Sequence, residues 1–400
     1  MNRTLGLLDI ENLRDRYATY RRLRATAPAL EVQINDEPNI VVTRFRDVDA
    51  LLKDSTALVQ PSAGEYPGHI GTGAASVFYK LSLPHMDPPD HGDMRKILLA
   101  AFNYAAIQRM QTMVTGVIES ALDAIEPNTP VEVVKALAAR IPSEVACGML
   151  HVPAEKAAAM FGRVDALSSI VSHTPITEEA LRKANEAAAY YFDFFDGLAA
   201  ANRSLPDDDL VGALVKARDR GLWSSEALAT TLMGLFIASY HTTKTAISNA
   251  LHAFATHPPQ YELLRNDAAL CPAAWEELLR FDSPVHFVHR YASVPMSIAG
   301  RSIVPRTRLL LGLASANRDD EQFVNADVFD IRRSPGRHLS FAYGRHFCAG
   351  AQLSRLEGKL LFEGLARRFA RLHPTGEAVA RGHDLSFPVI ERLTLEFEPN

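Results

Sequence analysis

Cysteine is scarce in this sequence of 400 residues, which contains only Cys147, Cys271 and Cys348. An odd and sparse set of this kind argues against a disulfide framework and favours a reducing compartment. Cys147 and Cys271 lie in stretches with helical patterning, so we expect them to be small core residues. Charged residues interrupt segment 1–24, and we therefore expect neither a signal peptide nor a membrane anchor. These features predict a soluble, cytoplasmic protein.

The sequence also lacks an excess of positive charge, interdomain linkers and repeats. Its formal net charge is −5, which gives no indication of a nucleic-acid partner. A chain of 400 residues suggests two or three domains by length alone. However, we find no Gly/Ser-rich or Pro-rich linker, no low-complexity tract and no internal repeat. The hydrophobic content of 47% suffices for one large core, so we expect a single domain over residues 1–400.

Cys348 is the cysteine whose surroundings indicate chemistry. The leucines that follow it recur with a helical period and predict a helix over residues 351–368. A thiol just before a helix N-terminus is favoured as its anion, because free backbone N–H groups and the helix dipole stabilise negative charge there. Gly344 and Gly350 permit positive φ and close approach to a flat group. The pattern predicts a metal-bound thiolate, although a free cysteine in an ordinary loop explains Cys348 taken alone.

Phe341, Gly344, His346, Cys348 and Gly350 form the pattern Phe-x-x-Gly-x-His-x-Cys-x-Gly. This pattern resembles the haem-binding loop of the cytochrome P-450 superfamily. The resemblance implies haem b (iron protoporphyrin IX), with Cys348 as the axial ligand of the iron. It also implies a fold class that is mainly α with small β-sheets, in one haem domain.

A second resemblance lies in the longest predicted helix, residues 225–256, which ends at His257 and two prolines. Its middle places polar residues within an apolar run, and buried polar groups need partners or a function. The segment resembles the family's oxygen-activation helix, with Ala238 as its small residue and Thr242 as its threonine. Ser239 stands where glycine is usual, and His241 stands where an acid is usual.

This second resemblance implies that Thr242 and His241 act in catalysis by delivering protons. Two plainer interpretations stay open. The Thr242 hydroxyl bonds back to the preceding helical turn, or His241 points away and only packs or bonds to a neighbouring helix.

Two further segments resemble haem-propionate-binding parts of the family. A helix is predicted from about Asp87 to about Phe102, and it places His91 and Arg95 on one face, where they can grip an anion. A solvated basic face is the plainer interpretation of the same spacing. Arg290, in the extended run 284–290, resembles the family's second propionate-binding arginine.

Glu277 and Arg280 lie three residues apart on a short predicted helix, 272–281, and match the family's structural Glu-x-x-Arg motif. We assign them no catalytic role.

The remaining chain gives coarser expectations. We predict a hairpin over 31–43 with its turn at 35–39, a helix over 45–53 and a long functional loop over 59–83 that the resemblance places over the substrate pocket. Residues 105–198 are expected to be nearly all helical, with turns at 126–129 and 172–177. We expect 168–203 to form a mobile pair of helices over the pocket and 384–396 to form a final hairpin with its tip at 387–389.

The resemblance places several residues at the substrate pocket, and we expect one of the two histidines among them to turn away. These substrate-binding candidates are Tyr240, Val285, His286, His289 and Phe387.

The predicted activity is that of a haem-thiolate monooxygenase that hydroxylates or dealkylates a small organic molecule. No flavin-binding or iron–sulfur cysteine pattern is present, so we expect electrons from a separate ferredoxin and its reductase. The expected basic docking residues are Lys96, Arg337, Arg345, Arg355 and Lys359. The atypical Ser239 and His241 leave two alternatives, which are a peroxide-driven or coupling/rearrangement haem enzyme and a non-catalytic haem sensor.

Overall fold

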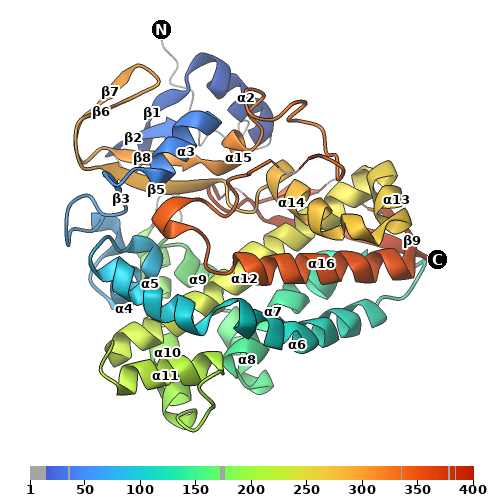
Figure 1. The fold of residues 1–400 in the computed structure, drawn as a ribbon, viewed down its shortest axis with the longest axis horizontal. Coiled ribbons are helices and arrows are strands. Elements are labelled where there is room, and N and C mark those ends of the chain that lie inside the picture. The colour runs from blue at the N-terminus through green and yellow to red at the C-terminus, as the bar shows by residue number, and fades with distance from the viewer. Residues whose placement is uncertain (1–14, 35–36, 172–175, 335, 377–378, 383) are drawn as a thin grey trace. The chain divides into compact units, whose positions relative to one another are not determined.

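The computed structural model describes residues 15–34, 37–171, 176–334, 336–376, 379–382 and 384–400 (Figure 1). The chain divides into two compact units. The first unit comprises residues 1–57, 115–141 and 242–400. The second unit comprises residues 58–114 and 142–241.

Helices make up most of the described chain. The α-helices are α2 (Arg16–Thr26), α3 (Phe45–Lys53), α4 (Ala74–Leu81), α5 (Asp90–Ala101), α6 (Tyr104–Asp123), α7 (Arg140–Leu150), α8 (Ala154–Phe161), α9 (Val164–Ser168), α10 (Glu178–Ala201), α11 (Leu210–Asp219), α12 (Ser225–Thr256), α13 (Pro258–Asn266), α14 (Cys271–Phe281), α15 (Leu313–Ala316) and α16 (Ala351–Arg368). Short 3₁₀ turns occur at Gly68–Ile70, Leu83–His85, Ala268–Leu270 and Gly344–His346, and a π-helical turn occurs at Val134–Ala139. Among the described helices, none is both long and apolar enough to cross a membrane.

The strands form small sheets. They are β1 (Ala29–Ile34), β2 (Glu37–Val42), β3 (Ala57–Leu58), β4 (Val131–Glu132), β5 (Phe287–Ala292), β6 (Met296–Ile298), β7 (Arg301–Ile303), β8 (Arg308–Gly312), β9 (Phe369–Pro374), β10 (Ala380–Arg381), β11 (Ile390–Arg392) and β12 (Thr394–Pro399). The largest sheet has the order β1-β2-β8-β5-β3, in which β2 and β8 are parallel while β1–β2 and β5–β8 are antiparallel. The smaller sheets are β4-β12-β9, β10-β11 and β6-β7.

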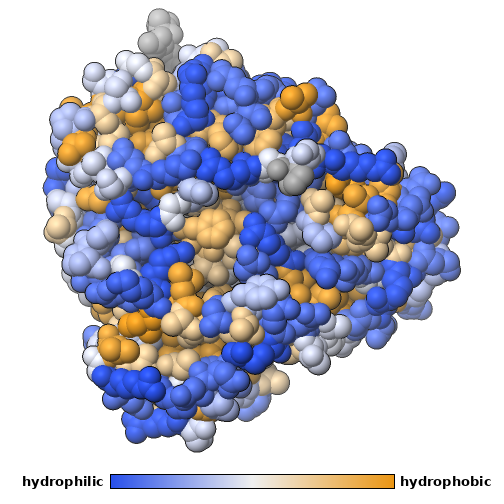
Figure 2. Space-filling model, in the orientation of Figure 1, coloured by the Kyte–Doolittle hydropathy of each residue, from blue (hydrophilic) through white to orange (hydrophobic). Residues whose placement is uncertain are grey.

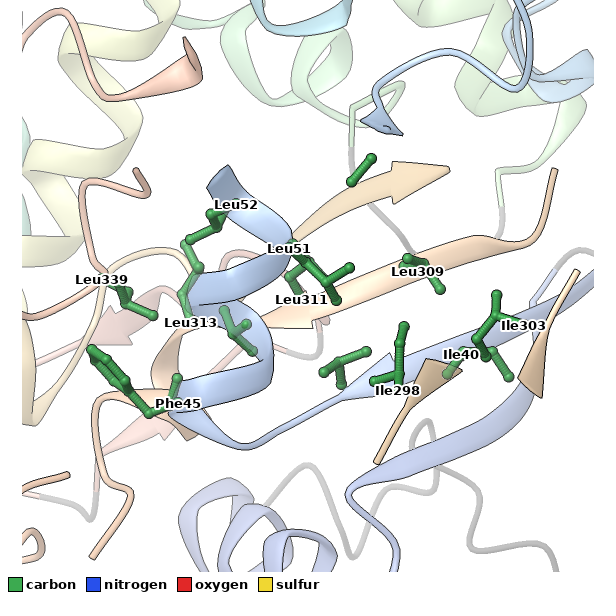
Figure 3. Close-up of a cluster of buried hydrophobic side chains, with 14 of the residues drawn as sticks. Ile40, Phe45, Leu51, Leu52, Ile298, Ile303, Leu309, Leu311, Leu313 and Leu339 are labelled. Atoms are coloured by element: carbon green, nitrogen blue, oxygen red, sulfur yellow. The ribbon is translucent and has the colours of Figure 1, made fainter. Parts of the chain in front are cut away.

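One apolar cluster of the first unit joins α3 to the large sheet (Figure 3). The buried residues of α3 are Phe45, Val48, Leu51 and Leu52, whose spacing puts them on one helical face. Every residue of β8 is buried, and Leu311 lies beside Leu51 of this helix, whereas Leu309 lies farther along the strand on the side of Ile303. The packing fixes the C-terminal end of α3, which meets the cysteine loop as described below.

Hydrophilic side chains cover most of the face shown in Figure 2, and hydrophobic ones gather there in separate patches.

The helix predictions with strong periodicity are confirmed. The structure gives α3, α12 and α16 the predicted bounds, and α14 begins one residue earlier than expected. α12 ends just before His257, and the next helix, α13, begins with proline in its first turn. The break between the two helices therefore follows from the His-Pro-Pro sequence.

The loop predicted over 59–83 is only partly correct. It contains α4, whose buried Ala75, Phe78 and Tyr79 give the helix an apolar face that the surrounding glycines and prolines obscured. The predicted hairpin 31–43 is confirmed, but Glu37, Pro38 and Asn39 belong to β2 rather than to the turn. Pro38 is tolerated because β8 pairs with β2 only from Asn39 onward. Residues 35–36 lie outside the described part of the chain.

The expectation of almost continuous helix over 105–198 missed β4, which pairs with β12. A strand of two residues has no periodicity to detect. Segment 168–203 contains one long helix, α10, and the next helix, α11, lies beyond it, so the predicted helix pair within this segment is wrong. Residues 172–175 lie outside the described part of the chain.

The final hairpin, predicted over 384–396 with its tip at 387–389, is formed by β10 and β11 and begins earlier than expected. β11 pairs with β10, while β12 pairs with β9 and β4. Residues 387–389 therefore lie in the connection from β10 to β11. Alternation of apolar residues predicts a strand, but it does not choose between partners that are distant in sequence.

Candidate functional site

The cysteine loop is a tight backbone structure in the first unit. The Cys348 amide donates a hydrogen bond to the Phe341 carbonyl at 3.0 Å, and the Phe347 amide donates to the Gly344 carbonyl at 3.0 Å. Ala342 and Gly344 have φ angles of 53° and 70°. Cys348 is exposed, and α16 begins three residues later. The loop thus presents the thiol outside a helix N-terminus, as the sequence predicted.

Gly344 is required by its surroundings. A Cβ built on this residue would lie 2.3 Å from the carbonyl oxygen of Leu52, at the end of α3. The positive φ is a second obstacle to any other residue. The loop therefore rests directly on α3 through glycine backbone.

The three thiols differ in their environments. Burial raises the pKa of Cys147 to about 11 and that of Cys271 to about 12, with smaller contributions from nearby carboxylates. Cys271 is buried as expected, whereas Cys147 is half-buried. Only the exposed Cys348 combines access with a helix start, so its donor chemistry fits a metal-bound thiolate.

Arg355 connects α16 to α14 beside the cysteine loop. Its Nε and one terminal nitrogen donate to Glu276 at 2.8 and 3.1 Å, and its guanidinium carbon lies 4.9 Å from the centre of the Phe341 ring. The hydrogen bond to Glu276 raises the pKa of Arg355, and the negative charges of Glu276 and Cys348 raise it further. His338 Nε2 lies 3.2 Å from the same carboxylate. Although burial raises the pKa of Glu276, the bonds to His338 and Arg355 outweigh it and bring the value to about 2.

Arg345 donates to the Asp54 carbonyl at 3.0 Å, just after α3. Arg337 pairs with Asp49 at 2.6 Å, and Lys359 pairs with Glu363 at 3.7 Å. Lys96, on α5 of the second unit, pairs with Asp93 at 3.1 Å. The predicted docking residues are thus basic side chains with local partners.

The first-unit candidates around β5 are mostly buried. Arg290 and His289 are buried, and an Arg290 terminal nitrogen donates to the His289 carbonyl at 2.7 Å. Val285 is half-buried against the cluster under α3. Phe387 is half-buried, and its amide donates to the Asp384 carboxylate at 2.8 Å.

His286 lies in a buried polar cluster. Its Nδ1 is 2.8 Å from the Tyr20 hydroxyl, and its ring lies 5.6 Å from that of Tyr17. Burial lowers the pKa of His286 well below its usual range, with nearby Arg16 adding to the effect. This placement favours the expectation that one of the two histidines turns away from substrate.

In the second unit, α5 begins at Asp90, so the helix start lies after both prolines. His91 is buried, and Arg95 is half-buried one turn further along the same helix. The Asp87 carboxylate accepts the amides of Val59 and Gln60 at 3.0 Å each, which anchors the segment that precedes α4.

The middle of α12 is accessible, although this helix has 32 residues and its flanks are buried. Ala238 is exposed, and Ser239, Tyr240, His241 and Thr242 are half-buried. The Ser239 hydroxyl donates to the Phe236 carbonyl at 3.1 Å, so serine at the usual glycine position is accommodated by bonding back to its own helix.

One residue near this segment had no signal in the sequence. Asp165 of α9 lies 3.7 Å from His241, measured from Oδ1 to Nε2. Both residues belong to the second unit, but 76 positions separate them, and no spacing rule links residues so far apart.

Comparisons with known proteins show the family to which the chain belongs. Residues 7–381 match the family model described as Cytochrome P450. The chain is 30% identical to 6-deoxyerythronolide B hydroxylase of Saccharopolyspora erythraea, over 90% of this chain and 89% of the relative. It is 32% identical to vitamin D(3) 25-hydroxylase of Pseudonocardia autotrophica, over 88% and 85% of the two chains.

A solved structure of P450BioI, in complex with acyl carrier protein ligated by hexadec-9Z-enoic acid, has the same fold. Its TM-score is 0.89 at 30% identity, with 97% of this chain and 99% of the other covered. The predicted fold class is therefore confirmed, and the chain belongs to the cytochrome P450 family as a P450 monooxygenase.

Proposed function

We propose that this protein binds haem b through Cys348 and hydroxylates a small organic molecule. Membership of the family implies a haem with a cysteine thiolate ligand. The observation that supports Cys348 is its exposed thiol immediately before α16, in a loop whose backbone bonds close around it. When bound, the haem supplies the reductive activation of dioxygen. We further propose that residues 1–400 make up one haem domain.

The haem contacts proposed beside Cys348 come from the same loop and from α12. Phe341, Gly344, His346 and Gly350 shape the loop, and glycine lets the backbone approach a flat group. Ala238 contributes an exposed small side chain in the middle of α12, which suits contact with such a group.

We assign the haem propionates to His91, Arg95 and Arg290. Arginine suits this task because its planar guanidinium pairs with carboxylates through two parallel hydrogen bonds. His91 and Arg95 support the assignment by their i, i+4 spacing on α5.

Thr242 and His241 are proposed to deliver protons for dioxygen cleavage. Histidine suits acid–base work, because its unperturbed pKa of about 6.5 lies near the working pH. Thr242 is the next residue of α12 after His241.

The proposed substrate is a small organic molecule, in line with the hydroxylases among the relatives. Tyr240, Val285, His289 and Phe387 are proposed as substrate contacts. Val285, Phe387 and Tyr240 are only half-buried, which supports contact with a ligand. His286 was a further candidate, but its bond to Tyr20 supports a structural role instead.

We propose that a ferredoxin and its reductase supply the electrons in the cytoplasm. The basic residues Arg337, Arg345, Arg355 and Lys359 lie on or near the cysteine loop and α16, which supports docking of an acidic carrier. A peroxide-driven reaction is the competing function, and Ser239 and His241 favour it because they depart from the usual oxygen-activation pattern.

Two measurements test the proposal. The reduced carbon-monoxide complex of the wild type should show the strongly red-shifted absorption band of thiolate-ligated haem, and Cys348→His should lose it. Cys147→Ser is the matched control and should keep the band. A normal band in Cys348→His would show that another residue is the ligand.

Turnover should then require the reductase chain. Substrate oxidation with peroxide alone, at the rate reached with ferredoxin and reductase, would favour the peroxide-driven function. Absence of turnover under every condition and with every substrate would indicate a sensor.

A further inference from the structure

His241 faces a carboxylate that lies outside its own helix. Asp165 Oδ1 is 3.7 Å from His241 Nε2, which is within ion-pair distance. The Asp165 side chain is 85% exposed, whereas that of His241 is 15% exposed. The pair therefore connects a largely enclosed imidazole to bulk water.

Aromatic packing between α8 and α12 holds the segment before Asp165 against the helix that carries His241. Phe161, at the end of α8, stacks on Phe236 of α12 and lies tilted against Tyr240 of the same helix, with 4.6 Å between ring centres in each case. Aromatic pairs of this kind stabilise the contact between two elements, because each ring buries a large apolar surface. Asp165 follows Phe161 by four residues, so its position relative to α12 is fixed by this contact.

The burial of α9 orients Asp165. Val164 and Leu167 are fully buried, and they flank Asp165 on the other side of this short helix. The Tyr191 hydroxyl donates to the Met160 carbonyl at 2.6 Å, which ties the preceding turn to α10. Asp165 thus projects from an element that is anchored on two sides.

The charged and titratable groups around the pair come from three elements. Arg163, just before α9, lies over the Tyr190 ring of α10 at 4.1 Å. Tyr191 of α10 is also close, and α12 itself carries Tyr240 and Lys244. Burial raises the pKa of Tyr240, and the negative charge of Asp165 raises it further, so that phenol stays protonated beside the pair.

We propose that Asp165 is a positioning residue for His241 that also admits protons from solvent. The carboxylate thus lies on α9, whereas the imidazole lies on α12. His241 gives a proton toward Thr242 as the imidazolium, and the neutral ring then takes a proton back from bulk solvent through water beside Asp165, so the imidazole ends each cycle unchanged and the carboxylate takes up no proton. A small side-chain rotation or one bridging water brings the 3.7 Å contact to hydrogen-bonding geometry. This inference rests on the proton-delivery role proposed for His241.

The first test measures how Asp165 affects the protonation of His241 in the absence of turnover. In the holoenzyme, held as the diamagnetic ferrous carbon-monoxide form and labelled with ¹⁵N-histidine, the His241 titration midpoint is followed by NMR. Asp165→Asn should lower this midpoint by about 0.2–0.7 pH unit, because an exposed carboxylate gives the imidazolium only modest support. Glu155→Gln removes the same charge from an exposed site on α8 and should leave the midpoint unchanged. Asp165→Glu should restore it.

The second test measures product formed per reductant consumed across pH. Asp165→Asn should lower this ratio and shift its pH dependence in the direction of the NMR midpoint, whereas Glu155→Gln should not. In the double variant with His241→Ala, Asp165→Asn should have no further effect, because its partner is gone. The carbon-monoxide band is recorded for each variant, so a misfolded protein is recognised.

The outcomes distinguish a failure of the role proposed for Asp165 from a failure of the proton delivery proposed for His241. If His241→Ala uncouples the reaction but Asp165→Asn behaves like Glu155→Gln in both tests, Asp165 is not the positioning residue. If His241→Ala itself has wild-type coupling and pH dependence, the relay through His241 is refuted together with the role of Asp165.

Discussion

Removing the charge of Glu277 should destabilise the first unit strongly. Arg280 is 2% exposed and Glu277 is 3% exposed, and the pair is joined by bonds of 2.7 and 2.8 Å. The remaining donors of Arg280 reach the carbonyls of Asn317, Ala326 and Val328 at 2.9, 2.7 and 3.1 Å. All five N–H groups of the guanidinium are therefore used.

Both carboxylate oxygens of Glu277 accept hydrogen bonds as well. Besides Arg280, its Oε1 accepts the Asp330 amide at 3.0 Å and the Arg333 Nε–H at 3.1 Å. Glu277→Gln keeps the shape but leaves the Arg280 charge buried and places an N–H₂ group against one of its donors. Breaking a buried ion pair by removing one partner costs about 3–5 kcal/mol, and we expect a loss in this range.

The assay is urea unfolding of the holoenzyme, with the free energy of unfolding compared between variants. Glu363→Gln is the matched control on α16, because its partner Lys359 is 3.7 Å away on an exposed helical face. This control should change the free energy by less than about 0.5 kcal/mol. A loss below about 1 kcal/mol in Glu277→Gln would refute the view that this pair fixes segment 317–333 to α14.

Three further predictions concern pH, the cysteine loop and electron transfer. Burial raises the pKa of Glu357 from 4.5 to about 8. Between these two pH values the carboxyl group is protonated in the folded state and ionised in the unfolded state. The free energy of unfolding should therefore fall as pH rises through this window. Glu357→Gln should flatten that dependence in urea unfolding measured at both ends of the window, and an unchanged slope would show that Glu357 is not responsible. Gly344→Ala should lower the free energy of unfolding by about 1–3 kcal/mol and weaken the red-shifted carbon-monoxide band, because the new Cβ would clash with the Leu52 carbonyl and the residue has a positive φ. A variant with the wild-type band and stability would contradict this prediction. Reversing the charges of Arg345 and Lys359 should slow reduction by ferredoxin and weaken the salt dependence of the reduction rate, while substrate binding is unchanged. If neither salt nor charge reversal changes the reduction rate, the docking face lies elsewhere.

Local sequence patterns determined the elements that carry the site. Apolar residues at helical spacing set α12 and α16, and a proline near its start marked α14. The glycines and Cys348 of the cysteine loop were recognisable because their chemistry depends on neighbours within ten positions. Membership of the P450 family was likewise readable from these segments.

Only the tertiary structure decided which distant residues meet. The contact of Asp165 with His241, the pairing of β12 with β4 and β9, and the burial of His286 beside Tyr20 all join positions far apart in the chain. Periodicity reports which face of an element is apolar, but it carries no information on what covers that face. Asp165 illustrates the limit, since an exposed aspartate on a five-residue helix is unremarkable until folding brings α9 against α12.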